Sequence, residues 1–203
     1  WRKIVGQVIV IVPWALVALQ FPDAQGQTPA TAYVSVFRDI SVLNFLALPV
    51  AIGILLYIAW ISFIGVAWSN STNVTDGLDG LAAGVGAISA AAISLLAFQF
   101  SGDATGYVMA ILAASLVGFL RYNRHPARIF LGDSGSLLIG FLLATCAITA
   151  AGPAPNMTAV VAPCIVLALP ILDMTFAMLR RTIERRGMFS PDHNHIHHRL
   201  LTR

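Results

Sequence analysis

A polar segment between two long apolar runs carries residue types that could do chemistry. Residues 70–80 read Asn-Ser-Thr-Asn-Val-Thr-Asp-Gly-Leu-Asp-Gly, with carboxamides at Asn70 and Asn73 and carboxylates at Asp76 and Asp79. Asp76 follows 36 residues without a formal charge (40–75), and 23 more follow Asp79 (80–102). Acidic groups beside a bilayer are costly, and they usually mark a functional site with a cation or polar partner nearby. The segment therefore predicts a site.

Two further polar motifs extend this prediction. Residues 130–136 read Phe-Leu-Gly-Asp-Ser-Gly-Ser and contain Asp133, and residues 190–199 contain a cluster of histidines followed by an arginine: His193, His195, His197, His198 and Arg199. The carboxylates of Asp76, Asp79 and Asp133 would repel a bare phosphate. Mg²⁺, or Mn²⁺ in its place, can bridge one or two carboxylates to the oxygens of a diphosphate. The motifs therefore indicate metal-assisted phosphoryl chemistry.

Each motif also has a simpler interpretation. An Asp before a helix is a routine N-cap, but Asp76 and Asp79 lie three residues apart, which on a helix would place both on one face. The histidines could hold zinc, although such sites usually include Cys or more regular spacing. With Arg199 they also suit phosphate or sugar binding or proton transfer, and a basic tail on anionic lipid is the remaining alternative. Asp173 fits either a contact between helices or a site role.

The elements that must position these motifs are membrane helices. The chain of 203 residues is 58% hydrophobic and 10% charged, with a mean hydropathy of +0.80, and a helix needs about 17–25 apolar residues to cross a bilayer. Six spans meet or approach that length: 4–21, 42–68, 81–99, 106–120, 134–151 and 157–179. We expect Pro49 to bend the second span. The predicted fold is all-α, a polytopic membrane helix bundle forming one integral membrane domain over residues 1–203.

Orientation follows from the distribution of positive charge, because Lys and Arg are retained on the cytoplasmic side. With six alternating spans, Arg38 lies on one face and eleven basic residues lie on the other: Arg2, Lys3, Arg121, Arg124, Arg128, Arg180, Arg181, Arg185, Arg186, Arg199 and Arg203. All three polar motifs then face the cytoplasm. Residues 70–80 and 130–136 precede helix N-termini, which bind anions such as phosphate. The net charge of +3 reflects this topology and does not indicate a nucleic-acid partner.

Four motifs in this order, NSTNVTDGLDG, FLGDSGS, PILD and HNHIHHRL, resemble those of the polyprenyl-phosphate N-acetylhexosamine-1-phosphate transferases, or glycosyltransferase family 4. The last motif is more similar to the GlcNAc-1-phosphate branch than to the MurNAc-pentapeptide translocase branch. The resemblance implies a multi-pass enzyme of the bacterial plasma membrane that makes the first lipid-linked intermediate of envelope glycan synthesis. A polyprenyl phosphate, undecaprenyl or decaprenyl, would attack the β-phosphorus of a UDP-N-acetylamino sugar and release UMP. A homodimer is compatible with these features.

The resemblance also implies roles for individual residues. It assigns Asp133 to the metal, Mg²⁺ with Mn²⁺ as an alternative, and it places Asp76 and Asp79 in the catalytic cleft. Asn70 and Asn73 would shape the nucleotide and metal environment. The histidines His195, His197 and His198, with Arg199 beside them, would bind the diphosphate or nucleotide, and His197 and His198 are the expected catalytic pair. Arg128 would either guide an anionic substrate or only enforce topology.

The chain departs from the family in one respect. Family members carry an adjacent Asp-Asp pair at the cytoplasmic end of an earlier span, and no such pair occurs in these 203 residues. We therefore expect a piece of a longer protein that lacks N-terminal helices and the last helix, and that is inactive alone. The alternatives are a MurNAc-pentapeptide translocase of the same family, an ion or solute transporter, a CDP-alcohol phosphotransferase and a noncatalytic membrane scaffold.

Overall fold

The computed structural model describes residues 2–20, 33–35, 39–44, 49–100 and 104–150, together with Ala168, Leu172 and Thr175, which are helical. Over these residues the chain forms helices α1 (Arg2–Gln20), α2 (Val50–Thr75), α3 (Leu81–Phe100), α4 (Ala104–Asn123) and α5 (Gly132–Ala150). Two short antiparallel strands, β1 (Tyr33–Ser35) and β2 (Asp39–Asn44), lie between α1 and α2. The predicted helical bundle is confirmed, and the small hairpin is an addition that the sequence did not predict.

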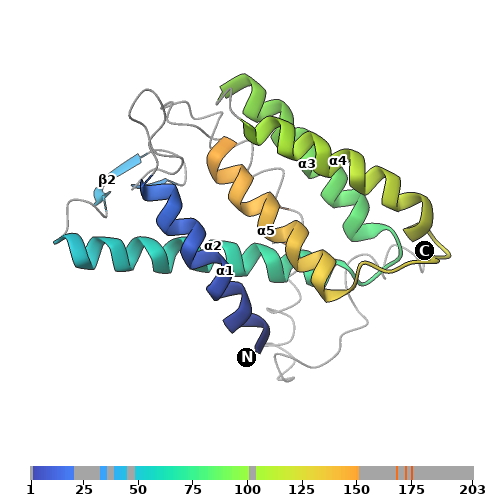
Figure 1. Cartoon of the computed structure of the whole chain (residues 1–203), viewed down its shortest axis with the longest axis horizontal. Helices are drawn as coiled ribbons and strands as arrows, with labels where there is room; N and C mark the ends of the chain where they lie inside the picture. Colours follow the sequence, from blue (N-terminus) through green and yellow to red (C-terminus); the bar gives the residue numbers. More distant parts are fainter. Residues whose placement is uncertain are drawn as a thin grey trace.

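The helices pack as two units that share α5 (Figure 1). In one unit α1 crosses α2, around a core that includes Ile11, Tyr57 and Ile61. In the other unit α3 and α4 lie side by side, around a core that includes Ile93 and Met109. Side chains of α5 pack into both cores, so this helix joins the two units.

Four helices, α2 to α5, are long and apolar enough to cross a membrane, whereas the apolar helix Lys3–Ala18 within α1 is shorter. Large apolar side chains are exposed on their outer faces, for example Leu55, Phe63, Ile88, Leu95 and Ile111. Such a surface suits lipid rather than water. The protein is therefore a multi-pass membrane protein.

Helix α2 is displaced from its predicted position, because we expected a span over 42–68 and a bend at Pro49. The helix instead begins after Pro49, whose carbonyl accepts the first backbone hydrogen bonds, from Ile52 and Gly53 at 2.8 and 3.0 Å. Proline has no amide hydrogen and suits a helix start, while residues 39–44 are used in β2. At the other end, the polar residues expected in a loop continue the helix to Thr75. The prediction of a bend was wrong.

A close contact between α2 and α5 fixes the position of the site. A Cβ atom at Gly140 of α5 would lie 2.7 Å from Ser69 Cα and 2.8 Å from the Trp68 carbonyl oxygen, both backbone atoms of α2. Small residues allow membrane helices to approach in this way. At the far end of the bundle, the hydroxyls of Thr105 in α4 and Thr149 in α5 are 3.1 Å apart. The ends of α2 and α4 and the starts of α3 and α5 therefore gather at the opposite end.

Candidate active site

The turn between α2 and α3 carries two of the predicted carboxylates. Asp76 is the C-cap residue of α2, and its backbone N–H donates to the Thr72 carbonyl at 3.2 Å. Gly80 closes the turn with φ +78°, a conformation that residues with a Cβ atom rarely adopt. Asp76 and Asp79 therefore flank a tight turn. The expectation that they share one face of a helix was wrong, because the helix ends before Gly77.

The start of α5 places Asp133 beside the last turns of α2. Gly132 begins the helix with φ +64°, and the Asn73 side chain spans the gap between the helices. Its amide nitrogen donates to Asp133 Oδ1 at 2.9 Å and to Ser136 Oγ at 2.8 Å. Ser136 is fully buried and donates in turn to the Gly132 carbonyl at 3.0 Å. Asn73 thus fixes the orientation of one Asp133 oxygen.

The loop after α4 is held against the α2–α3 turn from two sides. Asn123, buried at 2% exposure, accepts a hydrogen bond from the Gly80 N–H at 3.1 Å and donates to the Ile129 carbonyl at 2.9 Å. Asp79 Oδ2 lies 3.1 Å from His125 Nδ1 and accepts from the Ala127 N–H at 3.0 Å. These contacts between distant segments give the loop a defined position.

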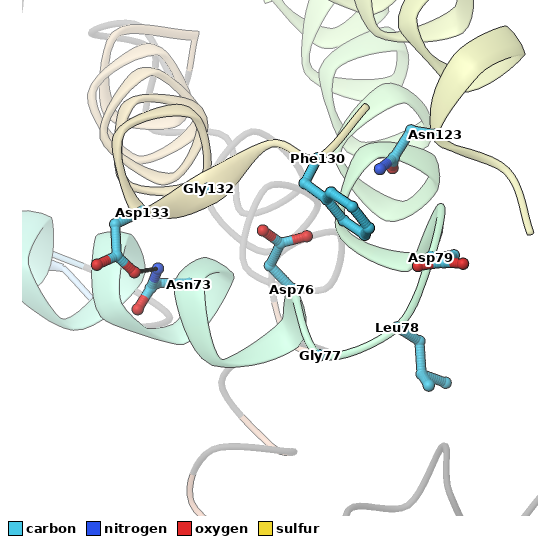
Figure 2. Close-up of a pocket in the computed structure, with 9 residues that line it drawn as sticks. All are labelled: Asn73, Asp76, Gly77, Leu78, Asp79, Asn123, Phe130, Gly132 and Asp133. Carbon is cyan, nitrogen blue, oxygen red and sulfur yellow. Dashed lines mark hydrogen bonds between the residues drawn. The ribbon is translucent and has the colours of Figure 1, made fainter. Parts of the chain in front are cut away.

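A hollow of about 360 Å³ lies between these three segments. We call it the polar hollow, and it is lined by Asn73, Asp76, Gly77, Leu78, Asp79, Asn123, Phe130, Gly132 and Asp133. In Figure 2 the Asp76 carboxylate points into it from the end of α2, between Asp133 on one side and the Phe130 ring on the other. The volume is within the usual range for small-molecule sites.

The two carboxylates of the turn have opposite electrostatic environments. Burial raises the pKa of Asp76, and the nearby carboxylate of Asp133 raises it further. The Ala127 N–H, followed by the His125 side chain, lowers the pKa of Asp79. A raised pKa at Asp76 means that a second negative charge is unfavourable in this part of the hollow. A cation placed between Asp76 and Asp133 would relieve that repulsion.

Helix α1 also contacts the site. Lys3 forms an ion pair with Asp133 Oδ2. One turn further along α1, the Gln7 side-chain oxygen accepts a hydrogen bond at 3.0 Å from the Asn70 amide, which also donates to the Val66 carbonyl at 2.8 Å. Asn70 is therefore directed at α1 and does not line the polar hollow.

The polar hollow fits a divalent cation of the Mg²⁺ type only in part. Among the described residues, no three His, Cys, Asp or Glu side chains are close enough together to enclose a metal. Mg²⁺ is commonly held by one or two carboxylates, with substrate phosphates and water completing its shell. Asp133 and Asp76 supply such a pair: the Asp133 carboxylate raises the pKa of Asp76, and Lys3 forms an ion pair with Asp133 alone. The donor set is therefore consistent with a metal shared between protein and substrate.

The structure brings together Asn73, Asp76, Asp79 and Asp133, four of the predicted site residues. Arg128 is exposed on the loop after α4, where its N–H donates to the Tyr122 carbonyl at 2.8 Å. Asp173 and the C-terminal residues His193, His195, His197, His198 and Arg199 lie outside the described residues.

Sequence reasoning missed Lys3 and Asn123. Lys3 was counted only as a topological charge, although it is the single lysine among the twelve basic residues of the chain. Its being the only lysine in the sequence was the feature that could have pointed to Lys3. Asn123 gave no signal, because its role depends on contacts with Gly80 and Ile129 that form only in the folded protein.

Fold and site together define a multi-pass membrane protein with an acidic, metal-compatible hollow at the ends of its helices. Residues 1–151 match the family described as glycosyl transferase family 4. The chain is 39% identical over 193 residues to the decaprenyl-phosphate N-acetylglucosaminephosphotransferase of Mycobacterium tuberculosis, covering 86% of this chain and 47% of that protein. The chain belongs to glycosyl transferase family 4.

Relatives with two different activities match the chain. The probable undecaprenyl-phosphate N-acetylglucosaminyl 1-phosphate transferase of Bacillus subtilis is 37% identical, over 71% of this chain and 42% of that protein. The phospho-N-acetylmuramoyl-pentapeptide-transferase of Corynebacterium jeikeium is 39% identical, over 72% of this chain and 45% of that protein. The chain thus spans about half the length of the curated relatives that it matches.

Proposed function

We propose that the protein transfers N-acetylglucosamine 1-phosphate from UDP-GlcNAc to a polyprenyl phosphate and releases UMP. The observation that carries this proposal is the convergence of Asp133, Asp76 and Asn73 on one hollow. The names of relatives in Mycobacterium tuberculosis and Bacillus subtilis supply the acceptor and the sugar phosphate. Asp133 would hold Mg²⁺ together with Asp76, and the bound ion would neutralise charge on the transferring phosphoryl group.

The protein residues around the hollow would position the donor. Phe130 lies at its edge with 71% of its surface exposed, and an exposed aromatic ring offers a stacking surface for a planar base. Helix α5 begins at Gly132, which lines the hollow, and the free backbone N–H groups of a helix start suit phosphate oxygens. Phosphoryl transfer depends largely on such positioning and charge stabilisation. The polar hollow therefore has surfaces suited to both parts of a nucleotide diphosphate.

The setting in the membrane is part of the proposal. We place the polar hollow on the cytoplasmic side of a bacterial plasma membrane, because eleven of the twelve basic residues lie on that side of the predicted topology. The bilayer would then deliver the polyprenyl tail to the same level. His195, His197, His198 and Arg199 would complete the site from the C-terminal segment, with Arg128 and Asn70 in supporting roles.

Charge placement supports a transferase over a transporter, which would need ionisable side chains near the middle of several spans. In the four described spans the only Asp, Glu, Lys or Arg residues are Arg121, in the last turn of α4, and Asp133, in the first turn of α5. A second candidate is the phospho-N-acetylmuramoyl-pentapeptide transferase activity of the Corynebacterium jeikeium relative. The donor separates these two candidates, since UDP-GlcNAc would be used by one and UDP-MurNAc-pentapeptide by the other.

The test measures UMP released from UDP-GlcNAc by the full-length protein in detergent. We expect release only when both Mg²⁺ and polyprenyl phosphate are present, and we expect Asp133→Asn to lower it by about a hundredfold or more, because a bound metal supplies several kcal/mol of charge stabilisation. Asp39→Asn, in β2 before α2 begins, is the matched control and should retain wild-type release. Undiminished release by Asp133→Asn, or release without the lipid, would show that the proposal is wrong.

A further inference from the structure

The ion pair between Lys3 and Asp133 has no role in the function proposed above. Both side chains are largely exposed, at 55% and 56% of their surface. An exposed pair of this kind contributes little to folding, because water screens it and ordering two side chains costs entropy. Because folding stability does not explain this ion pair, the contact of Lys3 with the expected metal ligand needs another explanation.

The contacts of Asp133 are divided between two partners. Asn73 donates to Oδ1 at 2.9 Å, and the Lys3 ammonium pairs with Oδ2. A divalent ion bound at Oδ2 would lie beside that ammonium, and the two positive charges would repel each other. Metal binding at this oxygen therefore requires Lys3 to move away.

The position of Lys3 is set by packing one turn along the same helix. Gln7 accepts a hydrogen bond from Asn70 at 3.0 Å, which fixes α1 against α2. Ile11, another turn along, is 1% exposed in the core that α1 and α2 share. The start of α1 is thus held beside the start of α5 (Figure 1). Lys3 reaches Asp133 from an anchored backbone, with only its side chain free to move.

We propose that Lys3 is a placeholder cation, which neutralises Asp133 while no metal is bound and lowers the affinity of this site for divalent ions by competing with them. The inference rests on the proposed function, because it takes Asp133 as the metal ligand. Lysine suits this role because its ammonium is a compact, strongly hydrated charge on a flexible chain, whereas an arginine could grip the carboxylate with two parallel hydrogen bonds. Lys3 thereby acts as a positioning residue that sets metal occupancy.

The test is a titration of the full-length protein with Mn²⁺ alone, followed by electron paramagnetic resonance of the free ion. We expect Lys3→Met to bind Mn²⁺ about two- to fivefold more tightly than the wild type, the range expected when an exposed ion pair is removed. Lys3→Arg should bind as weakly as the wild type or more weakly. The difference between Lys3→Met and wild type should also shrink in 1 M salt, where charges are screened over about 3 Å.

Arg121→Met is the control for loss of a positive charge, because Arg121 lies in the last turn of α4 and does not line the polar hollow. Its Mn²⁺ affinity should equal that of the wild type. Unchanged or weaker binding by Lys3→Met, with thermal stability like that of the wild type, would overturn the placeholder role. Asp133→Asn separates the two proposals: if the Mn²⁺ site survives in Asp133→Asn, the metal assignment in the proposed function is itself wrong. If Asp133→Asn abolishes the site but Lys3→Met does not tighten it, only the role of Lys3 fails.

Discussion

The contact of Gly140 with α2 predicts that a single methyl group will disturb both the bundle and the site. In Gly140→Ala the new Cβ would lie 2.7 Å from Ser69 Cα, whereas ordinary contact begins at 3.4 Å. Restoring ordinary contact therefore requires the helices to separate by about 0.7 Å, the difference between these two distances, because two of the three closest atoms belong to the α2 backbone and cannot rotate away. Overpacking of this kind costs about 1–3 kcal/mol.

The same movement would reach the proposed metal ligand. Gly140 lies one helical turn beyond Ser136, which accepts a hydrogen bond from Asn73. If a separation of 0.7 Å carried over to Asn73, its 2.9 Å bond to Asp133 would lengthen to about 3.6 Å, which is too long for a hydrogen bond. We therefore expect Gly140→Ala to lose transferase activity as well as stability.

Thermal unfolding in detergent and UMP release measure the two effects on the same preparation. Replacing glycine also stabilises the helix by about 0.5–1 kcal/mol through backbone entropy. A net loss of about 0–2.5 kcal/mol remains, centred near about 1.3 kcal/mol, and this central value lowers Tm by roughly 3–5 °C for a chain of this size. Gly118→Ala in α4 is the matched control, because its added Cβ would meet nothing within 4 Å. That control should be as stable as the wild type or slightly more stable. If Gly140→Ala behaves like Gly118→Ala in both assays, the packing of α2 on α5 described above is incorrect.

Two further predictions concern the loop after α4. Asn123→Leu should lower the free energy of unfolding by about 1–3 kcal/mol and raise KM for the nucleotide, because the Gly80 N–H and the Ile129 carbonyl lose their partner. Asn123→Asp keeps the acceptor for the Gly80 N–H and should lose less stability. Equal losses of stability in the two variants would contradict this account. The lowered pKa of Asp79 means that its contacts stabilise the loop above the ordinary Asp value of 3.8 and are lost as the pH falls through the lower folded-state value. Hydrogen exchange at the Ala127 amide, corrected for its intrinsic pH dependence, should therefore accelerate only in that acidic range in the wild type and at all pH values in Asp79→Ala, which has no side-chain acceptor. A protected Ala127 amide in Asp79→Ala would argue against the contact.

Much of the fold could be predicted because the apolar runs are long and sharply bounded. Helices α3 and α5 begin within two residues of their predicted starts. Gly80 follows Asp79 just before α3, and Gly132 precedes Asp133 at the start of α5. Helix α2 could not be placed correctly, because the segment Asn70–Thr75 has the composition of a loop. In the structure this segment remains helical, and Asn70, Thr72 and Thr75 satisfy their polar side chains by donating to the carbonyl four residues earlier.

The acidic residues of the candidate site could be predicted from the sequence, but the hydrogen bonds and ion pairs that they form could not. Clustering of Asp76, Asp79 and Asp133 around one hollow follows from topology, since alternating spans bring their segments to the same end. Which partner each acid contacts depends on side chains that are 46 or more residues apart in the sequence, as with His125 and Asp79 or Asn73 and Asp133. A sequence pattern holds no information about such distances. The contacts of Lys3 with Asp133 and of His125 with Asp79 are therefore apparent only in the structure.

Because α5 packs into both helical units, the hollow lies on the joint between them. Asn73 and Asp76 come from the α2 side of that joint, while Asn123 comes from the α4 side. A donor molecule that touches both sides would act as a cross-link, and its binding free energy would add to the cohesion of the whole bundle. Heat resistance of the purified protein should therefore rise with donor concentration, which gives a screen for ligands that needs no turnover.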